Sequence, residues 1–169
     1  MAWNATPPNA ALAVGAALPA LWTQQVGADL TVLTGVWTAY SPAVAGFGTA
    51  TVTTAGRYLA MGKTIIVRAA VTVSAIGVPG ATTVTVTLPF TSSATIVGAS
   101  NIIGTTNFRT NAGAYTVGHA YATASSATFS ARIAVPGAAT PNLSGWTGAV
   151  PAGQVGGDIW SFNLVYESA

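Results

Sequence analysis

The side chains that could carry out acid–base or nucleophilic chemistry are few in this sequence. It contains one histidine, His119, and three carboxylates, Asp29, Asp158 and Glu167. A Ser-His-Asp site would need His119 as base with one of the aspartates to orient it, and no GxSxG elbow supplies the serine. Catalytic groups must be placed together. We therefore expect no catalytic residue and no enzymatic activity, and interpret His119 as a half-buried histidine between aromatic residues on one face of a strand.

Metal, cofactor and sugar-cleaving sites are also disfavoured by this inventory. Zinc is bound by three or four His, Cys or carboxylate ligands, and the chain has one histidine and no cysteine. Three copies of His119, or of one acid, could still converge on a trimer axis. Nothing in the spacing of the three acids pairs them for glycoside hydrolysis, and neither GxxxxGK[ST] nor a strand-linked GxGxxG is present to bind phosphate. We expect no metal and no cofactor.

Charged side chains are scarce along the whole chain. They make up 5% of the 169 residues, against roughly 25% in a typical soluble domain. A monomer relies on a charged surface to stay soluble and unassociated, so the composition predicts that part of this surface is covered by other protein. The five cations are scattered in the sequence without a run or a basic stripe, and nucleic-acid binding is therefore not expected. They are Arg57, Lys63, Arg68, Arg109 and Arg132.

The mean hydropathy of +0.56 raises the question of membrane insertion. The most apolar stretch covers residues 10–21 and is interrupted by Gly15 and Pro19. It is too short to span a bilayer, which takes about 20 residues, and no Lys or Arg precedes it as in a signal peptide. We expect no membrane insertion. Without cysteine there is no disulfide framework, so stability must come from packing and association.

The first 35 residues differ in texture from the rest. They are rich in Ala and Pro and lack period-2 alternation. Four apolar residues within them follow the spacing of one helix face, which predicts a short helix over about 21–33. These residues are Trp22, Val26, Leu30 and Leu33. We interpret residues 1–35 as an extended N-terminal arm with one short helix.

From Trp37 onward, apolar and polar residues alternate, which is typical of strands with one buried face. The clearest alternating segments are 63–74, 83–90, 128–135 and 160–167, and Gly and Pro separate them where turns are needed. About eight short strands of this kind predict an all-β fold. We expect an antiparallel β-sandwich or jelly roll over residues 36–169.

Aromatic residues are the remaining candidates for recognition. Most lie in strand-like segments and are expected in the core or in subunit contacts, namely Trp37, Tyr40, Tyr58, Trp160, Phe162 and Tyr166. Trp146 differs because it lies in the Gly/Pro-rich segment 141–157, which reads as a loop. Loops carry binding residues more often than strands do, so Trp146 is the best candidate for a recognition contact.

Three stretches resemble a pattern of tailed-bacteriophage virion proteins. WTAYSP at 37–42, GRYLAMGK at 56–63 and VTVTLPF at 84–90 follow in order the pattern "WxxYxP … GrYxxxGkxvxv … vtvsLPf" of phage head-decoration, fibre and tail-tip proteins. The N-terminal layout is also similar, with Trp3 near the start and Asp29-Leu30 shortly before the β domain, although the helix here is poor in charge. The last strand, 162–167, resembles that of trimeric jelly rolls of the C1q/TNF type.

This resemblance implies a virion surface component that is assembled in the host bacterial cytoplasm and is usually a trimer. We expect a trimeric capsid decoration or head-fibre protein that attaches to the major capsid protein or another virion platform through its arm. The expected contacts are Trp3, Trp22, Val26, Leu30 and Leu33. One alternative is a receptor-binding tail-fibre or tail-tip protein that recognises a host-surface glycan through loops such as 141–157. Another is an extracellular carbohydrate-binding module, which would be a folded monomer.

Overall fold

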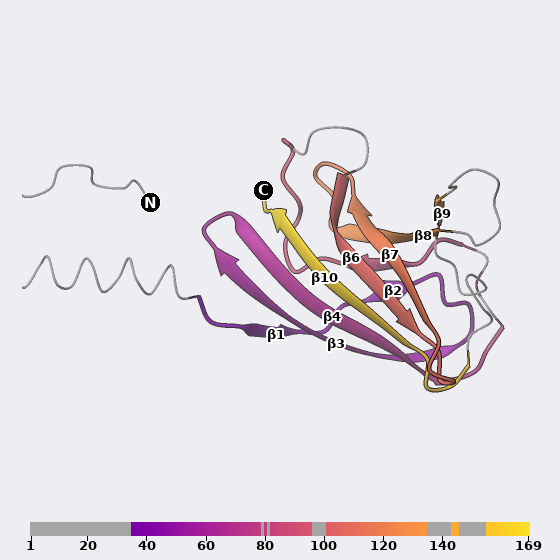
Figure 1. Cartoon of the computed structure of the whole chain (residues 1–169). Helices are drawn as coiled ribbons and strands as arrows, with labels where there is room; N and C mark the ends of the chain where they lie inside the picture. The colour runs from indigo at the N-terminus through magenta and orange to yellow at the C-terminus, as the bar shows by residue number, and fades with distance from the viewer. Residues whose placement is uncertain (1–34, 79, 81, 96–100, 135–142, 146–154) are drawn as a thin grey trace, which may run out of the picture. The chain divides into compact units, whose positions relative to one another are not determined.

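A computed structural model describes residues 35–78, 80, 82–95, 101–134, 143–145 and 155–169 (Figure 1). Residues from Gly35 to the C-terminus belong to one compact unit. The predicted helix over 21–33 and the rest of the predicted arm up to residue 34 lie outside the described residues. The arm and its helix therefore stay predictions.

Ten strands form one antiparallel sheet, and the described residues contain no helix. The strands are β1 (Thr38–Tyr40), β2 (Val44–Ala45), β3 (Thr51–Met61), β4 (Thr64–Ala75), β5 (Thr85–Thr87), β6 (Asn101–Arg109), β7 (Tyr115–Ala122), β8 (Thr128–Ala134), β9 (Leu143–Gly145) and β10 (Ile159–Glu167). Their order across the sheet is β1-β3-β4-β10-β6-β7-β8-β5-β2, and β9 pairs with β8. The prediction of an all-β antiparallel fold is confirmed.

The two central strands show why the sequence folds in this way. In β4, Val67, Val71 and Val73 are fully buried and Ala69 is buried on the same face, while the residues that alternate with these four lie toward the opposite face. The register pairs Val71 with Trp160 of β10, so the buried side chains of both strands lie on one face of the sheet. This period-2 burial is the pattern predicted from the alternation in the sequence.

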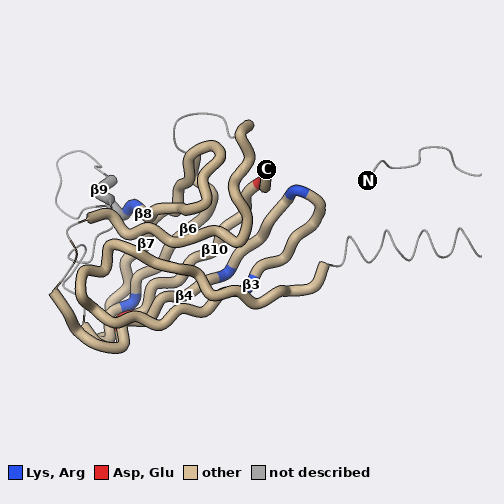
Figure 2. The backbone as a smooth tube through the Cα atoms, turned by 180° about the vertical axis from the view of Figure 1, so that it is seen from behind, with Lys and Arg blue, Asp and Glu red and all other residues tan. Residues whose placement is uncertain are grey.

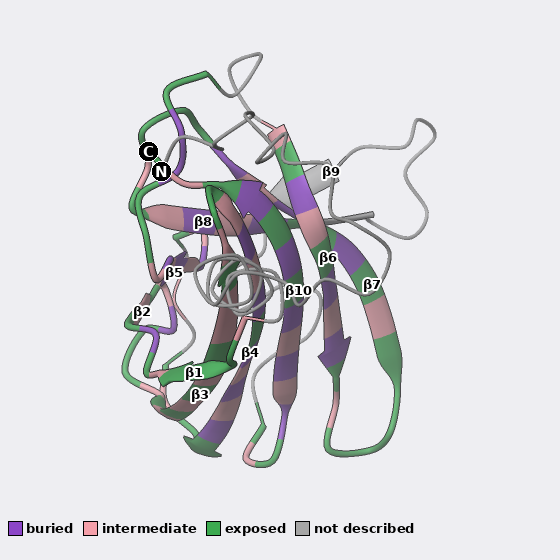
Figure 3. Ribbon diagram, turned by 90° about the vertical axis from the view of Figure 1, so that its left-hand side faces the viewer, coloured by how far each residue is buried: buried purple, intermediate pink, exposed green. Residues whose placement is uncertain are grey.

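The sheet curls so that its buried face closes on itself. Figure 3 shows β8 passing behind β10, and Phe129 of β8 packs against Phe162 of β10 with ring centroids 5.1 Å apart. Phe47, which follows β2, packs on Trp160 with ring centroids 4.4 Å apart. Aromatic pairs at such distances contribute beyond their buried area. The expectation that Trp160 and Phe162 are core residues is confirmed.

The strand predicted over 83–90 is shorter in the structure, where β5 covers only Thr85–Thr87. Pro89 lacks an N–H and cannot continue the ladder of hydrogen bonds. The preceding Leu88 N–H still donates to the carbonyl oxygen of Ala127 at 2.8 Å. The alternation in this segment predicts the buried face correctly for Val84, Val86 and Leu88, whereas Phe90, expected on the same face, is 42% exposed.

Candidate functional site

The residues expected to make anchoring and recognition contacts cannot be placed. Trp3, Trp22, Val26, Leu30, Leu33 and Trp146 all lie outside the described residues. Asp29 lies outside them as well. Their roles stay predictions, and the candidate site is built from the β domain alone.

Asp158 has a structural role in the described residues. It is fully buried immediately before β10. Its two carboxylate oxygens accept the backbone N–H groups of Asn111 and Val155, each at 2.8 Å. These charge-assisted hydrogen bonds hold the β6–β7 turn against the segment that enters β10. The carboxylate is thus occupied by backbone donors.

His119 is exposed on β7, so the expectation of a half-buried histidine is wrong. Its strand alternates as predicted, but the face that lines the core carries Gly118, Ala120 and Ala122, and His119 lies on the opposite face. No hydrogen bond joins His119 to Asp158 in the described part of the chain. Among the described residues no group of three His, Asp or Glu side chains could hold a metal ion.

The outward face of the sheet carries a continuous row of polar side chains, one from each of six neighbouring strands. Each member is the direct register partner of the next, from β3 across β4, β10, β6 and β7 to β8. All six side chains are exposed. We call this set the polar row; it consists of Arg57, Arg68, Asn163, Thr105, His119 and Arg132.

The polar row brings together most of the cationic side chains of the chain. Three of the five cations, together with the one histidine, lie in this row, although they are far apart in the sequence. The two described carboxylates lie near the opposite ends of β10, at Asp158 and Glu167, whereas the row crosses its middle at Asn163 (Figure 2). No arginine of the row forms an ion pair within the described residues. The row is therefore a basic and polar track without internal neutralisation.

At one end of the row, two arginines lie directly opposite each other. Arg57 of β3 pairs with Arg68 of β4, and like charges in such positions are destabilising. The indole of Trp37 compensates in part. It lies 5.0 Å from the Arg57 guanidinium carbon and 5.5 Å from that of Arg68, measured to the ring centroid. Both distances are within the range of favourable cation–π contacts.

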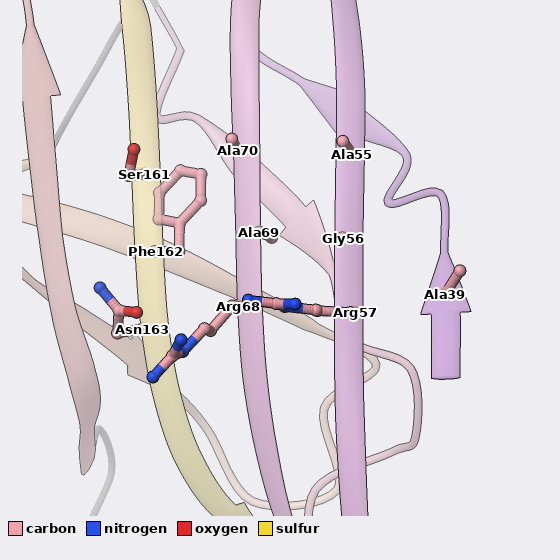
Figure 4. A pocket seen from close by; sticks show the side chains of 10 residues that line it. All are labelled: Ala39, Ala55, Gly56, Arg57, Arg68, Ala69, Ala70, Ser161, Phe162 and Asn163. Carbon is pink, nitrogen blue, oxygen red and sulfur yellow. The ribbon is translucent and has the colours of Figure 1, made fainter. Parts of the chain in front are cut away.

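A shallow hollow of about 450 Å³ adjoins this arginine pair. Its lining comes from β1, β3, β4 and β10 and is formed by Ala39, Ala55, Gly56, Arg57, Arg68, Ala69, Ala70, Ser161, Phe162 and Asn163. Figure 4 shows Arg57 extending across β4 and Arg68 extending toward Asn163. The register places Ala55, Ala70 and Ser161 in the neighbouring row of the same face. Small side chains thus leave room beside the guanidinium groups.

The other end of the row repeats the pairing of an arginine with an aromatic ring. The Arg132 guanidinium carbon lies 4.5 Å from the ring centroid of Tyr121. Tyr121 and His119 are two residues apart on β7 and share its outward face. Stacking of this kind limits the conformations of a long side chain and keeps its charge at the surface.

The polar row was missed by sequence reasoning because its members are far apart along the chain. The period-2 pattern indicated which residues point outward on each strand. The register between strands decides which of them meet, and no run or motif encodes it. The only local signal was the position of Arg57 and Arg68 on either side of the expected turn at Gly62, which is compatible with a hairpin that pairs them.

No helix of the described residues is long and apolar enough to cross a bilayer. Comparison of the chain with protein-family models, with curated proteins and with solved structures found no match.

Proposed function

We propose that this chain is a structural subunit of a tailed-phage virion, a trimeric capsid decoration or head-fibre protein that attaches through its N-terminal arm. The observation that carries the self-association is a cluster of exposed apolar side chains on a chain with almost no charge. The virion assignment is supported by the resemblance of three segments to phage surface proteins.

Four of the ten exposed large apolar side chains of the described residues lie at one end of the sheet. This is the end where β4 and β6 finish and β7 and β10 begin, as the register of these strands requires (Figure 1). Ile76, Val78 and Tyr115 are there, exposed by 67%, 72% and 70%. Val155 is at the same end, because the N–H of Gly157 beside it bonds to the carbonyl of Val73. We call these four residues the apolar end.

Such a cluster fits a contact between copies. Exposed apolar patches mark interaction surfaces when they are contiguous, and the cores of subunit interfaces are depleted in charge. None of the four residues of the apolar end is charged, and the exposed Arg109 lies beside it as the register partner of Tyr115. A symmetric ring of identical chains would bury the same patch on every subunit.

The three segments that resemble phage proteins lie in the β domain. The first, at 37–42, contains β1; the second, at 56–63, covers the end of β3 and its turn into β4; the third, at 84–90, contains β5. As part of the proposal, the curled sheet is a jelly roll of the C1q/TNF type. The packing of β8 on β10 through Phe129 and Phe162 supports two layers.

The mass of the purified full chain in solution tests self-association. We expect three times the 16.8 kDa of one chain by light scattering coupled to size exclusion. A monomer over the micromolar range would refute the proposal at this step.

Attachment to a virion is tested separately with phage particles stripped of their surface proteins. The full chain is expected to sediment with such particles, while a chain that lacks residues 1–35 stays in the supernatant and keeps its oligomeric mass. If the shortened chain binds particles as well as the full chain, the arm is not the anchor.

A further inference from the structure

We infer that the polar row is a binding track for an acidic polysaccharide that lies across the strands and whose carboxylates are separated by neutral sugar units. The proposed binding surface lies at mid-strand on the outward face of the sheet and consists of described residues of a single chain. It does not depend on the proposed virion role.

The first support is the unbalanced charge at the arginine pair. Arg57 and Arg68 lie opposite each other without a carboxylate partner in the described residues, which costs stability in the free protein. A guanidinium is suited to bind a carboxylate through two parallel hydrogen bonds. A carboxylate that binds between the two side chains would relieve their repulsion. The ligand would thus supply the negative charge that the described residues do not place there.

The second support is the polar but uncharged middle of the row. Between Arg68 and His119 lie only Asn163 and Thr105. An amide and a hydroxyl can each donate and accept hydrogen bonds, which is what sugar hydroxyls require. Beside the arginine pair, Ala55 and Ala70 leave an apolar, shallow floor in the hollow, against which the C–H face of a sugar ring can pack.

The third support is the spacing of the positive charges. Arg57 and Arg132 are five strand steps apart, roughly 24 Å along the curled sheet at the usual distance between strands. Double-stranded DNA carries about one phosphate every 1.7 Å of helix axis, so the three arginines of the row would neutralise few of the phosphates within that length. A polysaccharide with a carboxylate on every second sugar has a charge density closer to that of the row.

The row also has the location that a long ligand requires. Its members lie in the middle of their strands, whereas the apolar end lies beyond the end of β4 and the start of β7. A polymer on the row would thus leave the proposed subunit contact free. Failure of carbohydrate binding and failure of self-association are therefore separate results.

The test uses the full-length chain and hyaluronan oligosaccharides, in which carboxylated and neutral sugars alternate, by isothermal titration calorimetry at an ionic strength of about 0.15 M, where charges more than about 8 Å apart are largely screened. Binding is expected for the unmodified chain. Arg68→Ala and Arg132→Ala are each expected to raise the dissociation constant about tenfold, because each loses a hydrogen bond to a charged group. The matched control is Arg109→Ala, which removes the same charge from the same face outside the row and should change affinity less than about twofold.

Three results would overturn the inference. The first is that hyaluronan does not bind, or that neutral dextran binds equally well. Either outcome would show that the carboxylate is not recognised. The second is tighter binding of a single-stranded DNA oligonucleotide than of hyaluronan, which would make the row a nucleic-acid surface. The third is an equal loss in the Arg68 and Arg109 variants, which would reduce the effect to net charge. Arg68→Ala removes a like-charge contact and is expected to fold, which circular dichroism checks.

Discussion

Two tyrosine hydroxyls near the closing strand differ in a way that the free energy of unfolding should reveal. The Tyr166 hydroxyl donates to the carbonyl of Phe90 at 2.9 Å and so joins β10 to the segment after β5. The Tyr40 hydroxyl is buried without a hydrogen-bond partner. A satisfied hydrogen bond contributes about 1 kcal/mol, whereas an unsatisfied buried group costs stability.

Replacing each tyrosine by phenylalanine should therefore have opposite results. Tyr166→Phe is expected to lower the free energy of unfolding by about 1 kcal/mol, and Tyr40→Phe to leave it unchanged or raise it. Urea denaturation at neutral pH measures both. Each variant is the control for the other, since both remove one oxygen atom from an aromatic ring. Equal losses in the two variants would contradict the assignment of hydrogen bonds.

The same two side chains predict how stability depends on pH. Burial raises the pKa of Tyr166 from 10.0 to about 12. Burial, and next the nearby Tyr166, raise the pKa of Tyr40 as well. Above pH 10 the unfolded chain releases these protons while the folded chain keeps them, so the folded state binds more protons. The free energy of unfolding must then fall as pH rises from 10 toward 12.

Denaturation curves at a series of pH values between 9 and 11 check this dependence. The loss should begin near pH 10, and Tyr166→Phe should reduce its slope because one of the two contributing groups is gone. Stability that is constant up to pH 11 in the unmodified chain would show that neither hydroxyl is protected from ionisation by the fold.

At the scale of the strands, the contact between β6 and β10 depends on a glycine. A register shift lies between Ile102 and Gly104 in the pairing of β6 with β7. A Cβ atom at position 104 would collide with the carbonyl oxygen of Asn163 and would lie 2.8 Å from the Cα atom of Leu164. The absence of a side chain thus allows the close approach of β6 to the strand that carries Asn163 of the polar row.

Gly104→Ala is therefore expected to destabilise the domain by about 2 kcal/mol, since the backbone must shift to admit a methyl group. Thermal unfolding followed by circular dichroism measures the effect. Gly156→Ala is the control, because the nearest atom to a Cβ at that position, the carbonyl oxygen of Ser74, is 3.9 Å away. A Gly104→Ala protein as stable as the Gly156→Ala protein would mean that the strands are less tightly apposed than described.

The strands themselves were predictable from the sequence, because burial on one face imposes period-2 alternation. The segments predicted over 63–74 and 128–135 became β4 and β8 with bounds that differ by one residue. Other features were not predictable. The alternation of β7 was recognised, but which of its faces lies inward depends on what packs there, and this decided the exposure of His119.

The polar row lies beyond the reach of strand patterns altogether. Arg68 is paired with Asn163 only because the last strand of the chain inserts between β4 and β6. That insertion is a property of the topology, which depends on long-range contacts and has no local sequence signal. The candidate site could thus be assembled only once the order and register of the strands were known.

At the scale of the whole molecule, the proposed self-association would explain both the scarcity of charge and the exposed apolar end. Charged residues normally keep monomers apart, and here the carboxylates of the described chain are few and lie at the ends of β10. The four exposed apolar side chains of the apolar end would then gain from being covered. Burial of one Ile or Val side chain contributes about 1.5–3 kcal/mol.

This predicts that a charge at the apolar end weakens self-association and leaves the fold intact. Ile76→Lys and Val78→Lys each place an ammonium group at an exposed position, so folding should be unaffected while the proposed contact loses apolar burial and gains a desolvation cost. We expect the midpoint concentration of assembly to rise about tenfold or more, as measured by light scattering over a dilution series. Val165→Lys is the matched control, because Val165 is similarly apolar and 56% exposed but lies near the opposite end of β10. If only the Val165 variant dissociates, the subunits meet through the outward face of the sheet, and the polar row would be covered in the assembly.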